Sequence, residues 1–228
     1  MSKKNRRHNN NEYTEPVRIT PNKEFQPKTN GQEEYVRSII ESDITFCTGP
    51  AGSGKTACAV GIGCEHLLKD KFNQIVITRP VVETGRNGLG YLPGDMENKI
   101  HPYLVPILDE MHIYLGKHRT EYFTQSGKIR IVPLEYMRGY NFHRSFIILD
   151  EAQNATLNQI KMLLTRIGRH STVVVTGDLS QSDLSEEHMG LKVCIDKLKS
   201  VRGVAIVELT HQDIVRNGII SRILEKLS

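Results

Sequence analysis

The chain has 228 residues but no tryptophan, only four cysteines and no long hydrophobic run. No stretch approaches the roughly 18 apolar residues that a membrane span needs, and the basic N-terminus is not followed by the apolar segment of a secretory signal. We therefore expect a cytoplasmic protein. The cysteines lie within apolar runs and lack the paired spacing of a metal knuckle or a disulfide framework, so buried reduced thiols are expected at Cys47, Cys58, Cys64 and Cys194.

Charge is balanced outside the N-terminus. Residues 1–23 hold six Lys and Arg against two Glu, which leaves 24 residues of each sign in the rest of the chain. The whole chain is 38% hydrophobic and 25% charged, which is typical of a globular protein. We predict a basic, disordered tail over residues 1–25 and a single domain over residues 26–228. The tail could contact nucleic acid or another anionic surface, or serve solubility alone.

Short β-branched runs alternate with helical periodicity from residue 30 onward. This pattern predicts an α/β fold, a mostly parallel sheet flanked by helices on both faces. The expected strands are 44–47, 75–78, 129–132, 146–149, 173–176 and 204–209. Helices are expected at 57–69, at 156–167 with a capping box from Thr156 and Gln159, and at 212–227. Residues 79–103 and 133–144 fit neither period and are predicted to be loops, which in compact domains are usually functional or mobile.

A glycine-rich motif, Gly-Pro-Ala-Gly-Ser-Gly-Lys-Thr, follows the first predicted strand and precedes a helix. In that context it is typical of a triphosphate-binding loop, because glycines let backbone N–H groups converge on phosphates and the helix adds its positive end. We expect Lys55 to bridge the β- and γ-phosphates and the Thr56 hydroxyl to bind Mg²⁺. The alternative is a glycine-rich turn without a ligand. The candidate nucleotide-binding residues are Gly49, Pro50, Ala51, Gly52, Ser53, Gly54, Lys55 and Thr56.

Two acidic residues, Asp150 and Glu151, end a second apolar run. Carboxylates are costly at the edge of a buried strand unless a cation or a proton transfer requires them. Asp150 therefore fits a direct or indirect partner of Mg²⁺, and Glu151 fits a base that polarises the water attacking the γ-phosphate. Taken alone, the pair would be an ordinary change from strand to loop, and the phosphate-binding motif favours the functional interpretation.

A third apolar run ends in Gly177 and Asp178, with Gln181 three residues later. We expect these polar groups to face the γ-phosphate, between the glycine-rich loop and the acidic pair, where they could sense hydrolysis. The alternative is a tight Gly-Asp turn with an exposed glutamine.

On a larger set of motifs the chain resembles the PhoH-like proteins, a family of RecA-like P-loop ATPases related to helicases. The resemblance covers about residues 26 to 227, and Asp-Glu-Ala-Gln-Asn at 150–154 is its most specific part. The motifs are Gly49–Thr56, Thr78–Pro80, Leu89–Asp95, Tyr136–Gly139, Leu149–Asn154, Gln159–Met162, Leu164–Gly168, Thr176–Asp178 and Asp213–Arg216.

This resemblance implies ATP binding and Mg²⁺-dependent hydrolysis, coupled to work on RNA or single-stranded nucleic acid. Asp178 and Gln181 resemble the γ-phosphate sensor of superfamily one helicases. Gln32 resembles the glutamine with which those helicases read adenine, a task that suits an amide because it donates and accepts hydrogen bonds at once. The alternative for Gln32 is an exposed residue in a capped helix.

Hydrolysis at such a site is usually accelerated by an arginine near the γ-phosphate. The chain is too short to hold a second lobe that would supply one, so we expect a ring, with six subunits as the first expectation, in which a neighbour completes the site. The candidates are Arg216, Arg166 and Arg138, each of which could equally be a surface arginine.

Two groups of basic and aromatic residues fall in the predicted loops: Arg86, Tyr91 and Lys99, and Arg138, Tyr140 and Arg144. Aromatic rings stack on bases and cations hold phosphates, so both groups are candidates for single-stranded nucleic acid. The alternative is that the aromatics pack into the core. A second function also stays open, a slow nucleotide-dependent scaffold that regulates a partner without unwinding.

Overall fold

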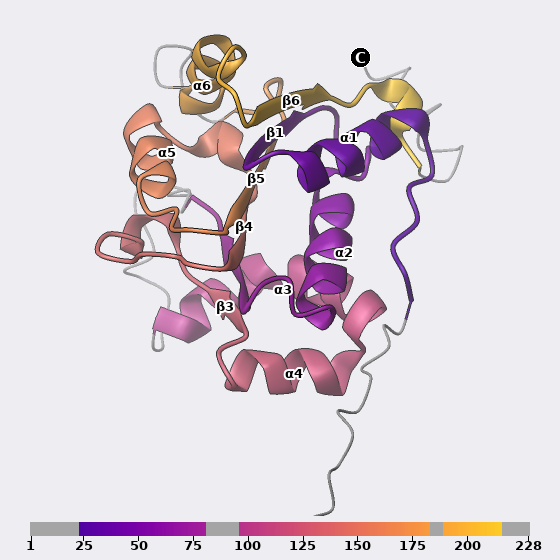
Figure 1. Cartoon of the computed structure of the whole chain (residues 1–228), viewed down its shortest axis with the longest axis vertical. Helices are drawn as coiled ribbons and strands as arrows, with labels where there is room; N and C mark the ends of the chain where they lie inside the picture. The colour runs from indigo at the N-terminus through magenta and orange to yellow at the C-terminus, as the bar shows by residue number, and fades with distance from the viewer. Residues whose placement is uncertain (1–22, 81–95, 183–188, 216–228) are drawn as a thin grey trace, which may run out of the picture.

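The computed structural model describes residues 23–80, 96–182 and 189–215, and within 96–104 it describes only the backbone (Figure 1). Its centre is a six-stranded, entirely parallel sheet in the order β3-β2-β4-β5-β1-β6. All six predicted strands are confirmed to within two residues. They are β1 (Ile44–Thr48), β2 (Gln74–Thr78), β3 (Ile129–Ile131), β4 (Ser145–Leu149), β5 (Thr172–Gly177) and β6 (Val204–Glu208).

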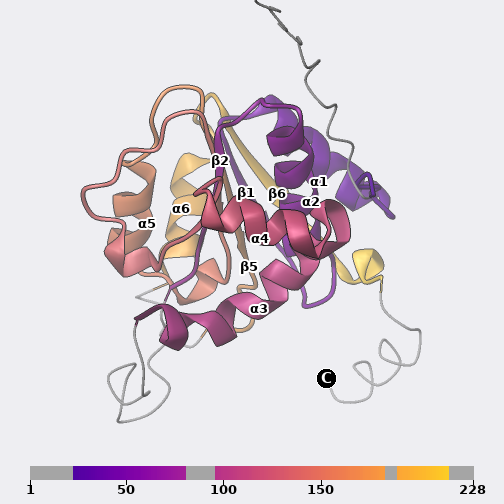
Figure 2. The same cartoon turned by 90° about the horizontal axis from the view of Figure 1, so that it is seen from below.

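Helices cover both faces of this sheet, as predicted. On one side lie α1, α2, α3 and α4, and on the other lie α5 and α6 (Figures 1 and 2). Their bounds are α1 (Asn30–Glu41), α2 (Lys55–Leu68), α3 (Met96–Leu115), α4 (Lys117–Gln125), α5 (Leu157–Leu164) and α6 (Gly190–Leu198). The described chain also contains the 3-10 helices η2 (Leu134–Tyr136), η3 (Ala152–Asn154) and η5 (His211–Asp213).

The alternation of side chains along each strand divides the core into two layers. Phe146 and Ile148 of β4 pack toward α2, whereas Ile147 and Leu149 pack toward α5 and α6. Helix α2 comes very close to the sheet, because a Cβ added to Gly63 would lie 2.9 Å from the Phe146 ring. Close packing of this helix fixes the position of its N-terminus, where the phosphate-binding motif ends.

Helix α5 begins as the sequence predicts. The Thr156 hydroxyl accepts a hydrogen bond from the backbone N–H of Gln159, and the Gln159 side chain accepts one from the N–H of Thr156. This capping box is expected to stabilise the helix start by about 1 kcal/mol. The helix ends at Leu164, three residues before the predicted end.

Two predicted boundaries are wrong. The loop predicted over 79–103 gives way to helix α3 at residue 96, because Pro102 and Pro106 obscured an apolar spacing that continues through Ile107 and Met111, both buried. The helix predicted from Gln212 does not begin there: the short η5 is capped by Thr210, and Ile214 is extended with φ −69° and ψ 107°. Residues 216–228 of that predicted helix lie outside the described residues.

Phe25 is packed into the domain. This residue falls in the predicted tail, yet its ring packs against the core and lies 6.0 Å from the Tyr114 ring, centroid to centroid. Residues 1–22 lie outside the described residues, so their disorder stays a prediction.

All four cysteines are buried and free, as expected. Burial raises the pKa of every one of these thiols, that of Cys58 to about 12, so they remain protonated at neutral pH. Within the described ranges, no helix has both the length and the apolar character to cross a bilayer.

Candidate nucleotide-binding site

Strand order brings the three predicted motifs to one edge of the sheet. Strand β5 lies between β4 and β1, so the glycine-rich loop after β1, the acidic pair after β4 and Asp178 after β5 are neighbours. In parallel α/β sheets ligands bind at this carboxyl edge. The three motifs share one cleft of about 630 Å³, lined also by residues 23–26 and 28 and by Glu110, Ile113 and Tyr114 of α3.

The glycine-rich loop is folded as a phosphate cradle. Gly49, Gly52 and Gly54 have φ values of 147°, 84° and 92°, which side chains rarely tolerate. At Gly49 the space is closed as well, because a Cβ there would lie 2.4 Å from the carbonyl oxygen of Leu209. The Lys55 ammonium donates to the carbonyl oxygens of Gly49 (2.6 Å) and Pro50 (3.0 Å). The cation therefore bends back over the loop where phosphates would compete for it.

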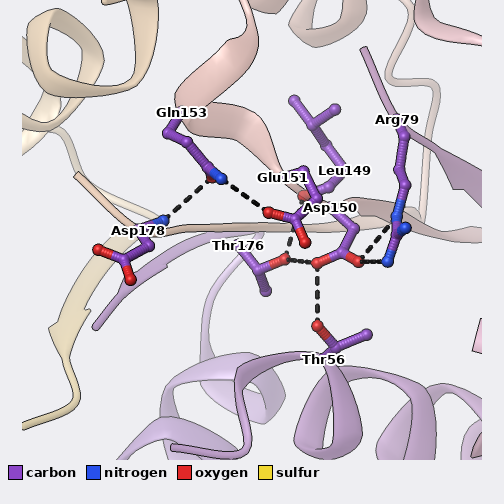
Figure 3. A network of polar contacts seen from close by, with 8 residues as sticks. All are labelled: Thr56, Arg79, Leu149, Asp150, Glu151, Gln153, Thr176 and Asp178. Carbon is purple, nitrogen blue, oxygen red and sulfur yellow. Dashed lines mark hydrogen bonds and ion pairs between the residues drawn. The ribbon is translucent and has the colours of Figure 1, made fainter. Parts of the chain in front are cut away.

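Asp150 joins the loop to the sheet. Its Oδ1 accepts hydrogen bonds from the Thr56 hydroxyl at 2.9 Å and from the Thr176 hydroxyl at 2.5 Å (Figure 3). The carboxylate is buried, and its contact with Thr56 spans 94 residues of sequence. The two residues predicted to serve magnesium are thus in direct contact.

Arg79 is a site residue for which the sequence analysis predicted no role. Its Nε and Nη2 donate to Asp150 Oδ2 at 3.0 Å and 2.5 Å. The strand pairing explains the contact. Thr78, the last residue of β2, lies opposite Leu149, the last residue of β4, so Arg79 and Asp150 follow the two strands side by side. The motif Thr78–Pro80 marked this segment in the sequence, but the sequence did not indicate that β2 pairs with β4.

Glu151 is exposed and has a left-handed backbone, with φ 55° and ψ 37°. Such a conformation costs a residue with a side chain about 1–2 kcal/mol, and strain of this kind concentrates at functional sites. Gln153, also without a predicted role, donates from Nε2 to Glu151 Oε2 at 2.7 Å. Its Oε1 accepts from the backbone N–H of Asp178 at 3.0 Å (Figure 3). One buried amide therefore connects the candidate base to the candidate sensor.

We expect Gln153→Met to lower the free energy of unfolding by about 1–3 kcal/mol, because it leaves the buried N–H of Asp178 without its acceptor. ATP turnover should fall as well, since Glu151 loses the contact that orients it. Chemical denaturation and a steady-state ATPase assay measure the two effects. Gln125→Met, an exposed position in α4, serves as the control, and equal behaviour of the two variants would contradict the role given to Gln153.

Asp178 has features of an ordinary turn residue and also of the predicted γ-phosphate sensor. Its Oδ1 accepts from the backbone N–H and the hydroxyl of Ser180, at 3.0 Å and 2.6 Å, as in an ordinary turn. Its Oδ2 is buried and has no hydrogen-bond partner within the described residues. Gln181 is exposed and, like Asp178, lines the cleft. A buried carboxylate oxygen without a partner suits a site that a bound group completes.

Gln32 is held by the glycine-rich loop. Its Nε2 donates to the Ser53 carbonyl at 2.8 Å and its Oε1 accepts from the Lys28 N–H at 2.9 Å. The helix is capped, by Thr29, but Gln32 is only 4% exposed, so the alternative of an exposed residue is wrong. Its role in reading adenine stays a prediction, and an adenine would have to share these bonds.

Asp213 fastens the C-terminal part of the described chain to this corner. The Thr29 hydroxyl donates to Oδ1 at 2.5 Å and the Thr210 N–H to Oδ2 at 2.8 Å. Burial alone would raise the pKa of Asp213, but these bonds and one from the Gly31 backbone outweigh it and lower the pKa. Two residues further on, the N–H of Val215 donates to the Gly52 carbonyl at 3.4 Å.

The predicted arginines are not brought to the cleft within the described residues. Arg166 and Arg138 do not line it, and Arg216 lies outside the described residues. The positions of Arg86 and Tyr91 and the side chain of Lys99 also lie outside them.

The other group of predicted nucleic-acid contacts is partly engaged within the domain. Tyr140 stacks on Phe142 with the rings 9° from parallel, and the Arg130 guanidinium lies 4.9 Å from its centroid. Arg144 donates to the Asn73 side chain and to the Asp70 carbonyl. Arg138 is exposed. The packing of Tyr140 therefore favours a structural role for its ring.

The family profile described as "PhoH-like protein" matches residues 24–228. The chain belongs to this family. PhoH-like proteins of Bacillus subtilis and Synechocystis are 43% and 42% identical over 99% and 87% of this chain, and Protein PhoH of Escherichia coli is 37% identical over 88%. The chain spans 71%, 60% and 57% of their respective lengths.

Solved structures place this PhoH-like domain among the P-loop folds. The large terminase of a thermophilic bacteriophage superposes over 89% of this chain and 51% of its own, with a TM-score of 0.59 and 10% identity. The large terminase of bacteriophage HK97 covers 89% and 47%, with a TM-score of 0.53 and 14% identity. At these identities the likeness establishes the fold, an α/β RecA-like sheet. Family and fold together support a nucleotide-binding protein of the P-loop class.

The PhoH-like site is suited to a magnesium ion that arrives with phosphates. Its oxygen donors, the Thr56 hydroxyl and the Asp150 carboxylate, are of the kind that Mg²⁺ prefers. Within the described residues no cluster of three His, Cys, Asp or Glu could form a metal cage. Mg²⁺ usually keeps several waters and binds through one or two protein groups plus substrate phosphates, which agrees with this sparse donor set.

Proposed function

We propose that this PhoH-like chain binds ATP with Mg²⁺ and hydrolyses it, with work on RNA or single-stranded nucleic acid as the output. One observation carries the proposal: a single cleft joins the phosphate cradle, the Thr56–Asp150 contact and Glu151 at the carboxyl ends of β1 and β4. Measurement of ATP turnover by wild type, with and without Mg²⁺, tests the first part. An absence of turnover in folded protein at all Mg²⁺ concentrations would overturn it.

The residues divide the work by their chemistry. Backbone N–H groups of the loop and the N-terminus of α2 bind phosphate oxygens, and Lys55 leaves the carbonyls of Gly49 and Pro50 to neutralise them. Thr56, with Asp150 as its direct or indirect partner, would hold Mg²⁺, which would supply charge neutralisation on the phosphates. Glu151, oriented by Gln153, accepts a proton from the attacking water. Asp178 and Gln181, which line the same cleft, would sense loss of the γ-phosphate through a change in their hydrogen-bond partners.

The base of the nucleotide has a place in the same cleft. Beyond the loop the lining includes Phe25, Ile113 and Tyr114, which offer apolar surface, and Gln32, which contacts the loop, is also part of the lining. A flat base against these side chains and the Gln32 amide fits this end of the cleft.

The composition of the described cleft supports assembly into a ring. No arginine is present among its described lining residues, whereas an arginine near the γ-phosphate commonly supplies much of the rate. We infer that a neighbouring subunit supplies it, from Arg216, Arg166 or Arg138, in a ring of six. Specific ATPase activity should therefore rise with protein concentration through the dissociation range, and a constant specific activity would contradict the ring.

Nucleic acid is proposed as the partner because exposed Arg138 and the basic segments of the chain can hold phosphates. ATP turnover should increase when RNA or single-stranded DNA is added, and binding should weaken steeply between low and physiological salt. Fluorescence anisotropy with labelled strands measures the second effect. Binding whose affinity does not depend on salt concentration would contradict this part of the proposal.

The second candidate function is a slow nucleotide-dependent scaffold. The same lack of a described arginine in the cleft favours it, because hydrolysis without one is slow. Turnover that stays slow at every protein concentration and with every strand tested would select the scaffold over the nucleic-acid motor.

A further inference from the structure

The surroundings of Asp150 are saturated with donors. Arg79 contributes two N–H groups to Oδ2, and the hydroxyls of Thr56 and Thr176 contribute one each to Oδ1. An ionised carboxylate offers about four acceptor positions. The protein itself therefore fills the hydrogen-bonding capacity of Asp150, and a cation could bind this carboxylate directly only by displacing a donor.

We propose that Arg79 is a positioning residue that keeps Asp150 an indirect partner of magnesium, acting through the Thr56 hydroxyl. The inference rests on the proposed function, because it concerns the metal that accompanies the nucleotide. Thr56 has one hydroxyl proton, and it gives this proton to Asp150 Oδ1 at 2.9 Å. The lone pairs of the Thr56 oxygen are then left for the cation. Asp150 sets the orientation of that hydroxyl, and Arg79 sets the orientation of Asp150.

The position of Arg79 outside the cleft supports a role in orienting the Asp150 carboxylate. Asp150 lines the cleft and Arg79 does not. The Arg79 side chain is 18% exposed and the Asp150 side chain 4%, so the guanidinium offsets a buried charge that would be costly alone (Figure 3). The guanidinium also holds Oδ2 in place with two N–H groups of one rigid plane, which the single ammonium of a lysine cannot do.

Removal of Arg79 should therefore weaken the contribution of magnesium to nucleotide binding. Titration calorimetry gives the affinity for ADP in MgCl₂ and in EDTA, and the ratio of the two is the magnesium-dependent gain. We expect Arg79→Ala to reduce this gain by about 10- to 100-fold, the usual cost of removing a partner that orients a metal-binding group. The affinity in EDTA should change little, because Arg79 does not line the cleft. Arg79→Lys should restore part of the gain.

Arg130→Ala is the matched control, since Arg130 also contacts a neighbouring side chain, the Tyr140 ring, but does not line the cleft. An unchanged gain in Arg79→Ala would overturn the proposal. A larger gain would also overturn it, because the freed carboxylate would then be a better, direct ligand. If the gain is unchanged because the affinity for ADP falls equally in MgCl₂ and in EDTA, Arg79 is merely structural. Should Arg79→Ala not fold, Arg79→Gln takes its place under the same criteria. Wild type that binds no ADP in either solution would refute the proposed function itself, which is a different outcome.

Discussion

Replacement of Glu151 by glutamine is expected to reduce ATP turnover by about 10²- to 10⁴-fold, the usual contribution of a positioned general base. Glutamine has the shape of glutamate but cannot accept the proton of the attacking water. Nucleotide affinity should remain near that of wild type, because the phosphates are held by the loop and by Lys55. Single-turnover kinetics and calorimetry with ADP measure the two quantities separately.

The matched control for this variant is Glu208→Gln. Glu208 is an exposed carboxylate at the end of β6, at the same edge of the sheet, but it does not line the cleft. Its replacement should leave turnover unchanged. If Glu151→Gln retained wild-type turnover, or if both variants lost it equally, Glu151 would not be the base. Loss of ADP affinity in Glu151→Gln would instead assign this residue to nucleotide binding.

The strands and the phosphate loop were predictable because local chemistry specifies them. Runs such as 146–149 and 173–176 are too apolar and β-branched to be exposed, and the glycines at 49, 52 and 54 are required by backbone angles that few other residues adopt. The acidic pair and Asp178 could be assigned to the same edge because parallel strands share the orientation of their carboxyl ends.

Arg79 and Gln153 were missed because their roles depend on which strands are neighbours. Arg79 meets Asp150 only because β2 pairs with β4, and nothing in the local sequence specifies that pairing. Gln153 connects Glu151 with Asp178 only because β5 lies beside β4. A sequence pattern indicates the type of an element, whereas the partners of a polar side chain follow from tertiary structure.

The ends of the domain show the same limit. Phe25 was predicted to be in a tail on the basis of charge and composition, yet its ring contacts the core at Tyr114 and Gly61. Asp213 belonged to a family motif to which the sequence assigned no role. In the structure it accepts a hydrogen bond from Thr29, the capping residue of α1, beside the glycine-rich loop. Long-range packing by single residues leaves no periodic trace in the sequence.

Lys55→Ala is expected to weaken nucleotide binding by about 10- to 100-fold, because a hydrogen bond to a charged group is worth about 1.5–3 kcal/mol. Turnover should fall further, by about 10²-fold or more, since the lysine also stabilises charge that develops as the γ-phosphate leaves. The stability of nucleotide-free protein should change little, because the ammonium now contacts only two carbonyl groups of a solvent-facing loop. Calorimetry, ATPase assays and thermal unfolding separate the three effects.

Lys69→Ala provides the control on the same helix. Lys69 follows the last residue of α2, about 20 Å from Lys55 at the rise of an α-helix, and forms an exposed ion pair with Glu65. Exposed pairs of this spacing contribute little to stability, so its loss should affect neither nucleotide binding nor turnover. Equal effects of the two substitutions would mean that positive charge on α2 acts from a distance. An effect of Lys55→Ala alone requires contact with the phosphates, because both variants lose one charge from the same helix.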